Sequence, residues 1–182
     1  MFFTKRGDDG YTDLLGGPRR SKDDLRIAVL GDVDEATSSI GLARACAQGT
    51  DTRAALLHVQ KDLYLLMADI ATVEGKAAGS PRLTDAQVAG LEELIRGFDG
   101  RVTIPREFVA PGDTLAGAAL DVARAVVRRA ERAVTHLLAG GDGATPAMVR
   151  YLNRLSSLLF GLARYEDGLA GVAPTISKEI VE

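Results

Sequence analysis

The 182-residue chain is poor in the residues that build disulfides, metal centres and membrane spans. Its single cysteine, Cys46, excludes an internal disulfide framework and is typical of the reducing cytoplasm, where we expect the protein. With that one cysteine and two separated histidines, His58 and His136, the chain has no ligand cluster for zinc, so no protein-held metal is expected. No apolar run approaches the roughly 20 residues that cross a bilayer, so no membrane span is expected.

The chain also carries little excess charge. A net charge of −3 gives no electrostatic reason to expect nucleic acid or an anionic membrane as a partner. Apolar residues make up 46% of the chain and charged residues 26%, which are ordinary values for a globular protein. The length favours one domain over 1–182, large enough to bury a substantial core.

Helical patterning fills most of the chain, and no alternating strand pattern of useful length interrupts it. We divide the domain into an N-terminal glycine-rich loop (1–22), a helical region (23–168) and a C-terminal tail (169–182). Five helices are predicted, over about 23–47, 51–73, 84–98, 113–139 and 146–168, with an extended segment over 100–112. Five long helices with mostly short connections predict an all-α five-helix bundle.

Local signals predict the helix starts and the buried faces. The predicted N-terminal caps are Ser21 with Asp24, Asp51 or Thr52, Thr84 with Gln87, and Thr145 before Pro146. In the fourth helix, we expect the apolar stripe to comprise Leu115, Ala119, Val122, Val126 and Leu137.

Three arginines four residues apart, Arg124, Arg128 and Arg132, stack along one face of the fourth predicted helix. Like charges at this spacing destabilise a helix by a few tenths of a kcal/mol per pair, so the stack needs a compensating interaction. Either the stack is a solvated or ion-paired face, or it faces an anion such as a triphosphate, which the planar guanidinium binds well. The spacing leaves both interpretations open.

The N-terminal loop reads TKRGDDGYTDLLGG and is followed by Lys22. Its glycines let backbone N–H groups approach a phosphate closely, and Thr4, Thr12 and Lys22 add donors and positive charge. Asp8 and Asp9 would repel phosphate unless Mg²⁺ intervenes or their carboxylates cap backbone amides. There is no Walker motif, and the same composition suits a glycine-rich tail without function.

Two further polar groups interrupt apolar helices. Asp32, Asp34 and Glu35 form an acidic cluster in the first helix, either as a surface cluster or as partners of the arginine stack. Asn153 lies on a partly polar face of the fifth helix, where its amide could bond a nucleotide or a neighbouring helix.

Taken together, these segments resemble the PduO-like ATP:cob(I)alamin adenosyltransferases. The resemblance rests on five motifs in family order and spacing, over about residues 4–165. They are the loop from Thr4 to Lys22, Gly31-Asp32-Val33-Asp34-Glu35, Phe108 before Pro111-Gly112, Arg124 to Arg132 with Arg-Arg-Ala-Glu-Arg at its end, and Tyr151-Leu152-Asn153-Arg154-Leu155-Ser156.

The resemblance implies a homotrimer of five-helix bundles that binds ATP and a corrinoid where subunits meet, with the N-terminal loop becoming ordered on binding. The implied reaction is attack of a cobalt(I) nucleophile on the 5′ carbon of ATP, which gives adenosylcobalamin and triphosphate. Such a displacement needs positioning and a neutralised leaving group more than a general base. A cobalamin reductase and an adenosylcobalamin-dependent enzyme are the implied protein partners.

The same resemblance implies roles for individual residues. Arg132 would contact the phosphates and stabilise the departing charge, while Arg128 would pair with Asp34 at or near the subunit interface. The ATP site, with Mg²⁺ on the triphosphate, is expected to comprise Thr4, Gly7, Asp8, Gly10, Thr12, Lys22, Arg128, Glu131, Arg132 and Asn153. The corrinoid site is expected to comprise Phe108, Pro111 and Gly112, with Phe108 packed against the corrin and helping to keep its lower axial position free of a ligand.

The chain departs from the family pattern at Arg6, Tyr11, Asp13, Ala36, Thr37, Asp113, Asp121 and Ser157. Some departures are expected to compensate one another, since Arg6 can pair with Asp13, and Asp121 can reach Arg124 at i+3. Two alternatives to the enzyme therefore stay open: a divergent, non-catalytic nucleotide- or corrinoid-binding protein (a carrier or regulator) on the same bundle, and a helical oligomer with a structural role.

Overall fold

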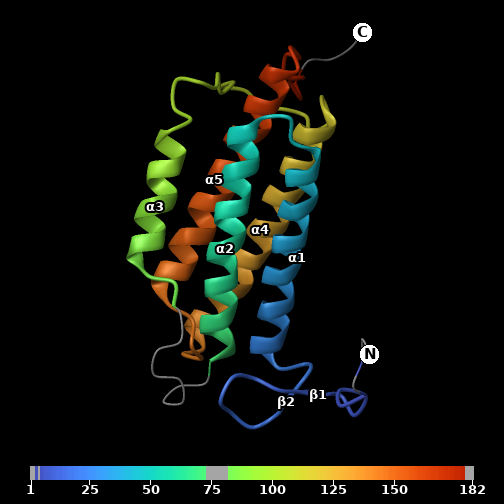
Figure 1. The fold of residues 1–182 in the computed structure, drawn as a ribbon, viewed down its shortest axis with the longest axis vertical. Helices are drawn as coiled ribbons and strands as arrows, with labels where there is room; N and C mark the ends of the chain where they lie inside the picture. Colours follow the sequence, from blue (N-terminus) through green and yellow to red (C-terminus); the bar gives the residue numbers. More distant parts are fainter. Residues whose placement is uncertain (1–2, 4, 73–81, 179–182) are drawn as a thin grey trace.

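The structure, a computed structural model, describes residue 3 and residues 5–72 and 82–178. Five helices make up the bundle: α1 (Leu25–Cys46), α2 (Thr50–Ala71), α3 (Asp85–Arg96), α4 (Leu115–Ala139) and α5 (Pro146–Leu169). A two-stranded antiparallel ribbon, β1 (Tyr11–Thr12) and β2 (Arg20–Ser21), lies in the N-terminal loop (Figure 1). The predicted five-helix, all-α architecture is confirmed.

The four long helices pack around one core, and the shorter α3 lies against α5 and α2 (Figure 1). The core side chains of α2 and α5 include Leu56, Leu63, Leu155 and Leu162, which are fully buried. Nothing in the part of the chain that the structure describes is a helix both long and apolar enough to cross a membrane.

The predicted stripe of α4 is partly wrong. Leu115 is 76% exposed and Val122 is 55% exposed, whereas the face that packs in the core carries Leu120, Val127 and Val134. Apolar residues occupy more than one face of α4, so periodicity alone did not select the buried face. The positions of α1 and α5, the two helices that α4 contacts most, decide which face is covered.

The start of α2 is capped from a distant part of the chain. Neither Asp51 nor Thr52 is its N-cap, which is Gly49. The buried carboxylate of Glu166 in α5 accepts hydrogen bonds from the backbone N–H groups of Gln48 (2.8 Å) and Gly49 (3.1 Å). A carboxylate at this position satisfies backbone donors and complements the helix dipole. The predicted local cap was wrong because a tertiary contact replaced it.

The other helix starts depend on local contacts. The predicted Ser21–Asp24 capping box is wrong, because Ser21 lies in β2 and Asp24 is itself the N-cap of α1, accepting from the N–H of Arg26 at 2.9 Å. The capping box of Thr84 with Gln87 is confirmed, as is Thr145 as the N-cap of α5.

A buried arginine joins three elements at the end of the bundle where the N-terminal loop lies. Arg26, only 3% exposed, donates to the carbonyls of Ile70 and Thr72 at 3.2 Å each and pairs with Asp142 in the α4–α5 turn. The N–H of Leu15 donates to the carbonyl of Ala71 at 2.9 Å. These contacts fix the base of the loop to the ends of α1, α2 and α4.

The segment between α3 and α4 contains no helix, in agreement with the prediction for 100–112, but it consists of turns and bends with one bridge and not of a continuous extended stretch. It ends at Thr114, the N-cap of α4, whose hydroxyl accepts from the N–H of Gly117 at 2.8 Å. Within it, Val109 forms an isolated antiparallel bridge with Ile176 of the C-terminal tail. The tail therefore lies beside this segment, at the opposite end of the bundle from the N-terminal loop (Figure 1).

Candidate functional site

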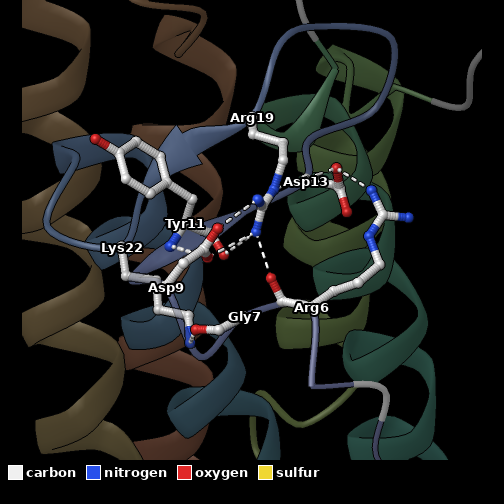
Figure 2. A network of polar contacts seen from close by, with 7 residues as sticks. All are labelled: Arg6, Gly7, Asp9, Tyr11, Asp13, Arg19 and Lys22. Atoms are coloured by element: carbon white, nitrogen blue, oxygen red, sulfur yellow. Dashed lines mark hydrogen bonds and ion pairs between the residues drawn. The ribbon is translucent and has the colours of Figure 1, made fainter.

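Arg19 organises the N-terminal loop (Figure 2). Its guanidinium donates to both carboxylate oxygens of Asp9 at 2.7 and 2.9 Å, and to the carbonyls of Arg6 at 2.5 Å and Tyr11 at 3.0 Å. Asp9 also accepts from the N–H of Tyr11 at 3.1 Å. The bond from Arg19 holds the pKa of the Asp9 carboxyl below its ordinary value. Of the two ways in which Asp9 could avoid repelling phosphate, the chain thus uses amide capping, with Arg19 neutralising the charge.

Arg6 and Asp13, two departures from the family pattern, form the predicted pair at 3.3 Å (Figure 2). Both side chains are largely exposed, so the pair contributes little to stability.

Lys22 and Gly7, two residues of the predicted ATP site, are in direct contact. The Lys22 Nζ donates to the Gly7 carbonyl at 2.6 Å, and a Cβ at position 7 would lie 2.9 Å from that nitrogen (Figure 2). Gly10 has φ +82°, which favours glycine. Asp8 is exposed and Thr12 lies in β1, while Thr4 lies outside the described residues.

The arginine stack on α4 does not act as one uniform surface. Arg124 pairs with Asp121 at 3.0 Å, as its i+3 spacing predicted. Arg128 and Arg132 are exposed, and the Arg132 guanidinium donates to the Arg128 carbonyl at 2.9 Å. Arg124 is ion-paired, as the first interpretation predicted. Arg128 and Arg132 are exposed, which both interpretations allow, so anion binding by these two arginines stays a prediction.

The acidic cluster of α1 faces an arginine outside the stack. Glu35 pairs with Arg129, and Asp32 lies 3.4 Å from the same guanidinium. Asp34 is exposed and forms no ion pair with Arg128 inside the described part of one chain, so the predicted Asp34–Arg128 pair stays a prediction. Sequence reasoning missed Arg129. Asp32 and Glu35, three residues apart on one helix face, were the available signal.

Two predicted ATP ligands on different helices are bonded to each other. The Asn153 amide donates to the Glu131 carboxylate at 2.9 Å, which joins α5 to α4 directly beside Arg132 in sequence. This bond fixes the Glu131 carboxylate and leaves its remaining acceptor capacity for a ligand.

A cavity of about 450 Å³ brings the predicted corrinoid residue Phe108 together with the arginine stack. Its wall includes Arg124 and Arg128 from α4 and Ser157 and Phe160 from α5. Its size is within the range of small-molecule sites. Phe108 is 79% exposed, as a residue available to a ligand would be. Pro111 and Gly112 do not line the cavity; both are exposed, and Gly112 has φ +128°.

A buried ion-pair network includes Asp121, which also lines the cavity. Arg164 lies 3.0 Å from Asp121 and 2.9 Å from Asp167, and all three side chains are almost fully buried. Asp167 also accepts from the Thr114 hydroxyl at 2.7 Å, so the network connects the α4 cap to Arg124 through Asp121. Sequence reasoning missed Arg164 and Asp167, because nothing local marks a charge that a distant helix buries.

Most of the predicted site residues that the structure describes lie either in the loop before α1 or on α4, α5 and the segment before α4 (Figure 1). Phe108 and Arg128 line the cavity, whereas Arg132, Glu131 and Asn153 lie outside its lining. Lys22 bonds to Gly7 within the loop, while Arg132 bonds to the Arg128 carbonyl and Asn153 bonds to Glu131. In the same described ranges, no group of three or more His, Cys, Asp or Glu side chains is arranged to hold a metal ion.

Comparison with known proteins gives consistent similarities. The profile of a family described as cobalamin adenosyltransferase matches residues 2–166. A corrinoid adenosyltransferase from Citrobacter freundii is 39% identical over 168 residues, covering 91% of this chain and 94% of the relative. A cobalamin adenosyltransferase from Cupriavidus metallidurans is 41% identical over 169 residues, covering 92% and 89%. A variant of the PduO-type ATP:corrinoid adenosyltransferase from Lactobacillus reuteri, solved with cobalamin and ATP, superposes with a TM-score of 0.87 at 30% identity, covering 98% of this chain and 97% of that one.

Proposed function

The chain belongs to the cobalamin adenosyltransferase family, and from that premise we propose that it transfers the 5′-adenosyl group of ATP to the cobalt(I) of a reduced corrinoid. The cobalt electron pair forms the cobalt–carbon bond, the C5′–oxygen bond breaks, and triphosphate leaves with the electrons of that bond. The observation that carries the proposal is the cavity, whose wall contains Phe108, Arg124 and Arg128. Arg132 follows Arg128 by one helical turn.

We assign the nucleotide to the surface that carries Arg132, Glu131 and Asn153. Arg132 is exposed and follows Glu131, whose carboxylate is bonded to Asn153, so consecutive positions of α4 supply a guanidinium and a held carboxylate. The guanidinium suits the negative charge that develops on the leaving triphosphate. Glu131 can accept from a ribose hydroxyl or an adenine amino group.

We assign the triphosphate to the loop that Lys22 closes. In the structure, the Lys22 ammonium is bonded to the Gly7 carbonyl, and a phosphate oxygen can replace that acceptor at the same nitrogen. Mg²⁺ enters as Mg·ATP, and Asp8 is the loop carboxylate suited to it, because it is exposed and Asp9 is already bonded to Arg19. We expect the N-terminal loop to become fully ordered when it binds the phosphates.

We propose that the complete site forms between subunits of a homotrimer. The loop precedes α1, whereas the cavity is lined from α4, α5 and the segment before α4, so a loop from one subunit and an α4 helix from another can complete one site. Leu115 and Val122 on α4 are exposed, as is Leu42 on α1. Val122 and Leu42 lie seven residues from the Arg129–Glu35 pair on antiparallel helices (Figure 1). These exposed apolar side chains on the α1–α4 face are the kind of surface that a subunit contact buries. Arg128 and Asp34, both exposed, are available to pair across it.

The chemistry of the substrate and product places the reaction between two others. Cobalt(I) must be supplied by a cobalamin reductase, and the product serves an adenosylcobalamin-dependent enzyme. The single cysteine favours the cytoplasm as the compartment.

The experiment that tests the proposal mixes the protein with Mg·ATP and chemically reduced cobalamin, and follows the visible spectrum for a light-sensitive adenosylcobalamin product. We expect wild-type turnover and a loss of about a hundredfold in kcat for Arg132→Ala, because one donor to the developing charge is removed. Arg96→Ala is the matched control, since Arg96 is an exposed arginine on α3 that pairs with Glu93 at 2.6 Å, away from the cavity. We expect its kcat to equal that of the wild type.

Two outcomes would contradict the assignment. ATP binding measured by calorimetry without product would favour the non-catalytic nucleotide-binding protein. Wild-type turnover that is unchanged in Arg132→Ala would keep the reaction and remove Arg132 from the site.

A further inference from the structure

Asp113, which replaces a family glycine after Gly112, binds the C-terminal tail. Its Oδ1 accepts from the Thr175 hydroxyl at 2.6 Å, and its Oδ2 accepts from the Thr175 N–H at 3.0 Å. These bonds hold the pKa of the Asp113 carboxyl below its ordinary value, so it is ionised at neutral pH. The Asp113 carboxylate therefore bonds to the C-terminal tail of its own chain.

The backbone continues the same contact along the segment that carries Phe108. The N–H of Ala110 donates to the Thr175 carbonyl at 2.8 Å, and the N–H of Ser177 donates to the Phe108 carbonyl at 2.8 Å. Together with the Val109–Ile176 bridge, they make the tail a short strand beside Phe108. The Phe108 backbone is hydrogen-bonded to the tail, while its exposed side chain lines the cavity.

We propose that Asp113 and Thr175 are positioning residues for Phe108, and that they set the affinity of the cavity for the corrinoid. The proposal rests on the proposed function, which assigns the corrinoid to this cavity. Phe108 belongs to an irregular segment whose ordering must otherwise be completed when the ligand binds. Tying that segment to the tail beforehand removes part of this entropic cost, so the ring is held ready to pack against the corrin.

The test is a series of variants at the two residues. Asp113→Ala removes both side-chain bonds without adding the freedom of a second glycine, and position 113 is not among the residues with positive φ. Thr175→Val removes the hydroxyl bond alone, and Thr175→Ser keeps both bonds. Glu93→Ala, which breaks an exposed pair on α3, is the control for general surface effects.

Three measurements are made on each full-length variant. The dissociation constant for cobalamin comes from an absorbance titration and hydrogen exchange reports the Ala110 and Ser177 amides, both in the presence of Mg·ATP. The turnover assay gives the KM for ATP. For Asp113→Ala we expect about tenfold weaker cobalamin binding and faster exchange at both amides, with an unchanged KM for ATP. Thr175→Val should weaken binding by about threefold, while Thr175→Ser and Glu93→Ala should match the wild type.

Each failure has a distinct meaning. Faster exchange with unchanged cobalamin affinity would show that the tail contact does not position Phe108, and would overturn the proposal. Unchanged hydrogen exchange in Asp113→Ala would show that the Asp113–Thr175 bonds do not hold the Phe108 segment to the tail, and would also overturn the proposal. A parallel rise in the ATP KM would indicate general structural damage and equally refute a specific role. Failure of the proposed function would show itself separately, as a wild-type protein that binds cobalamin but forms no product.

Discussion

Gly117, in the first turn of α4, is the position where one added methyl group should disturb the buried network around Arg164. A Cβ at position 117 would lie 2.3 Å from Asp167 Oδ1 and 2.9 Å from Thr114 Oγ1. Glycine here is not required by a left-handed backbone, because its φ is not positive. The close approach of the Asp167 carboxylate is what excludes a side chain.

The magnitude follows from two opposing effects. Replacing a helical glycine by alanine stabilises a helix by about 1 kcal/mol. Here Asp167 must move away, which breaks its 2.7 Å bond to the Thr114 hydroxyl and weakens its 2.9 Å pair with Arg164. Losing hydrogen bonds to a buried charge is worth about 1.5–3 kcal/mol each, and stranding the partner adds to this loss. We therefore expect Gly117→Ala to lower the free energy of unfolding by about 2 kcal/mol.

The effect should disappear once the carboxylate is removed. In an Asp167→Ala background the added methyl group has room, the Thr114 hydroxyl can rotate, and Gly117→Ala should change the free energy of unfolding by about 0 to +1 kcal/mol. The coupling energy between the two substitutions is then about 2–3 kcal/mol. Urea denaturation at one fixed protein concentration measures all four members of the cycle, since an oligomer unfolds in a concentration-dependent way.

Gly90 in α3 provides the matched control. An added Cβ there meets nothing within 4 Å, so Gly90→Ala should stabilise the protein by about 0.5–1 kcal/mol. If Gly117→Ala stabilised the wild type as Gly90→Ala does, the tight packing of Asp167 against α4 would be refuted. Equal effects of Gly117→Ala with and without Asp167 would refute the network as its cause.

Tyr151→Phe and Gly143→Ala test buried contacts elsewhere, with Gly100→Ala as the control for the second. Tyr151→Phe removes the 2.9 Å bond to Asp62 and should lower stability by about 1–3 kcal/mol. Burial raises the pKa of Tyr151 above its ordinary 10.0, so its contribution is full below that pH and is lost as pH rises further. The wild type should therefore lose more stability than Tyr151→Phe between about pH 9 and 11 in paired denaturation curves, and parallel curves would contradict this account. Gly143→Ala combines φ +83° with a Cβ 2.7 Å from Arg26, whereas Gly100→Ala has φ +76° and open space. Thermal unfolding should show a loss of about 1–2 kcal/mol for Gly100→Ala and at least twice that for Gly143→Ala, and equal losses would mean that Arg26 yields freely.

Several short-range sequence signals predicted their contacts correctly, although the Ser21–Asp24 capping box did not form. The Thr84 capping box, the Asp121–Arg124 pair at i+3 and the start of α5 at Thr145 are each decided by residues within one helical turn, and the structure contains all three. The candidate site was predicted differently, through the order and spacing of motifs. The resemblance pointed to Phe108 and the four-residue spacing to the arginine stack; Phe108, Arg124 and Arg128 line one cavity, and their roles toward a ligand stay predictions.

The contacts that were missed involve partners far apart in the chain. Glu166 caps α2 at Gln48 and Gly49, more than a hundred residues away, and replaces the local cap that the sequence favoured. Arg129 pairs with Asp32 and Glu35 of the acidic cluster on α1, for which a surface position and the arginine stack were the two alternatives. Asp113 was marked only as a departure from a family glycine, and its partner Thr175 lies in the tail. No local pattern encodes such pairs, because each depends on which helix faces meet.

The sequence by itself determined that five amphipathic helices form, roughly where each begins and ends, and which motifs they carry. Helix propensity, capping and 3.6-residue periodicity act over a few neighbouring residues, so they can be read from the chain directly. Only the tertiary structure decided which face of α4 is buried, which arginines are neutralised and which remain open, and that the tail lies against the Phe108 segment. Burial and ion pairing depend on the packing of helices that are distant in sequence, where desolvation makes each unpaired charge expensive and so selects one set of partners.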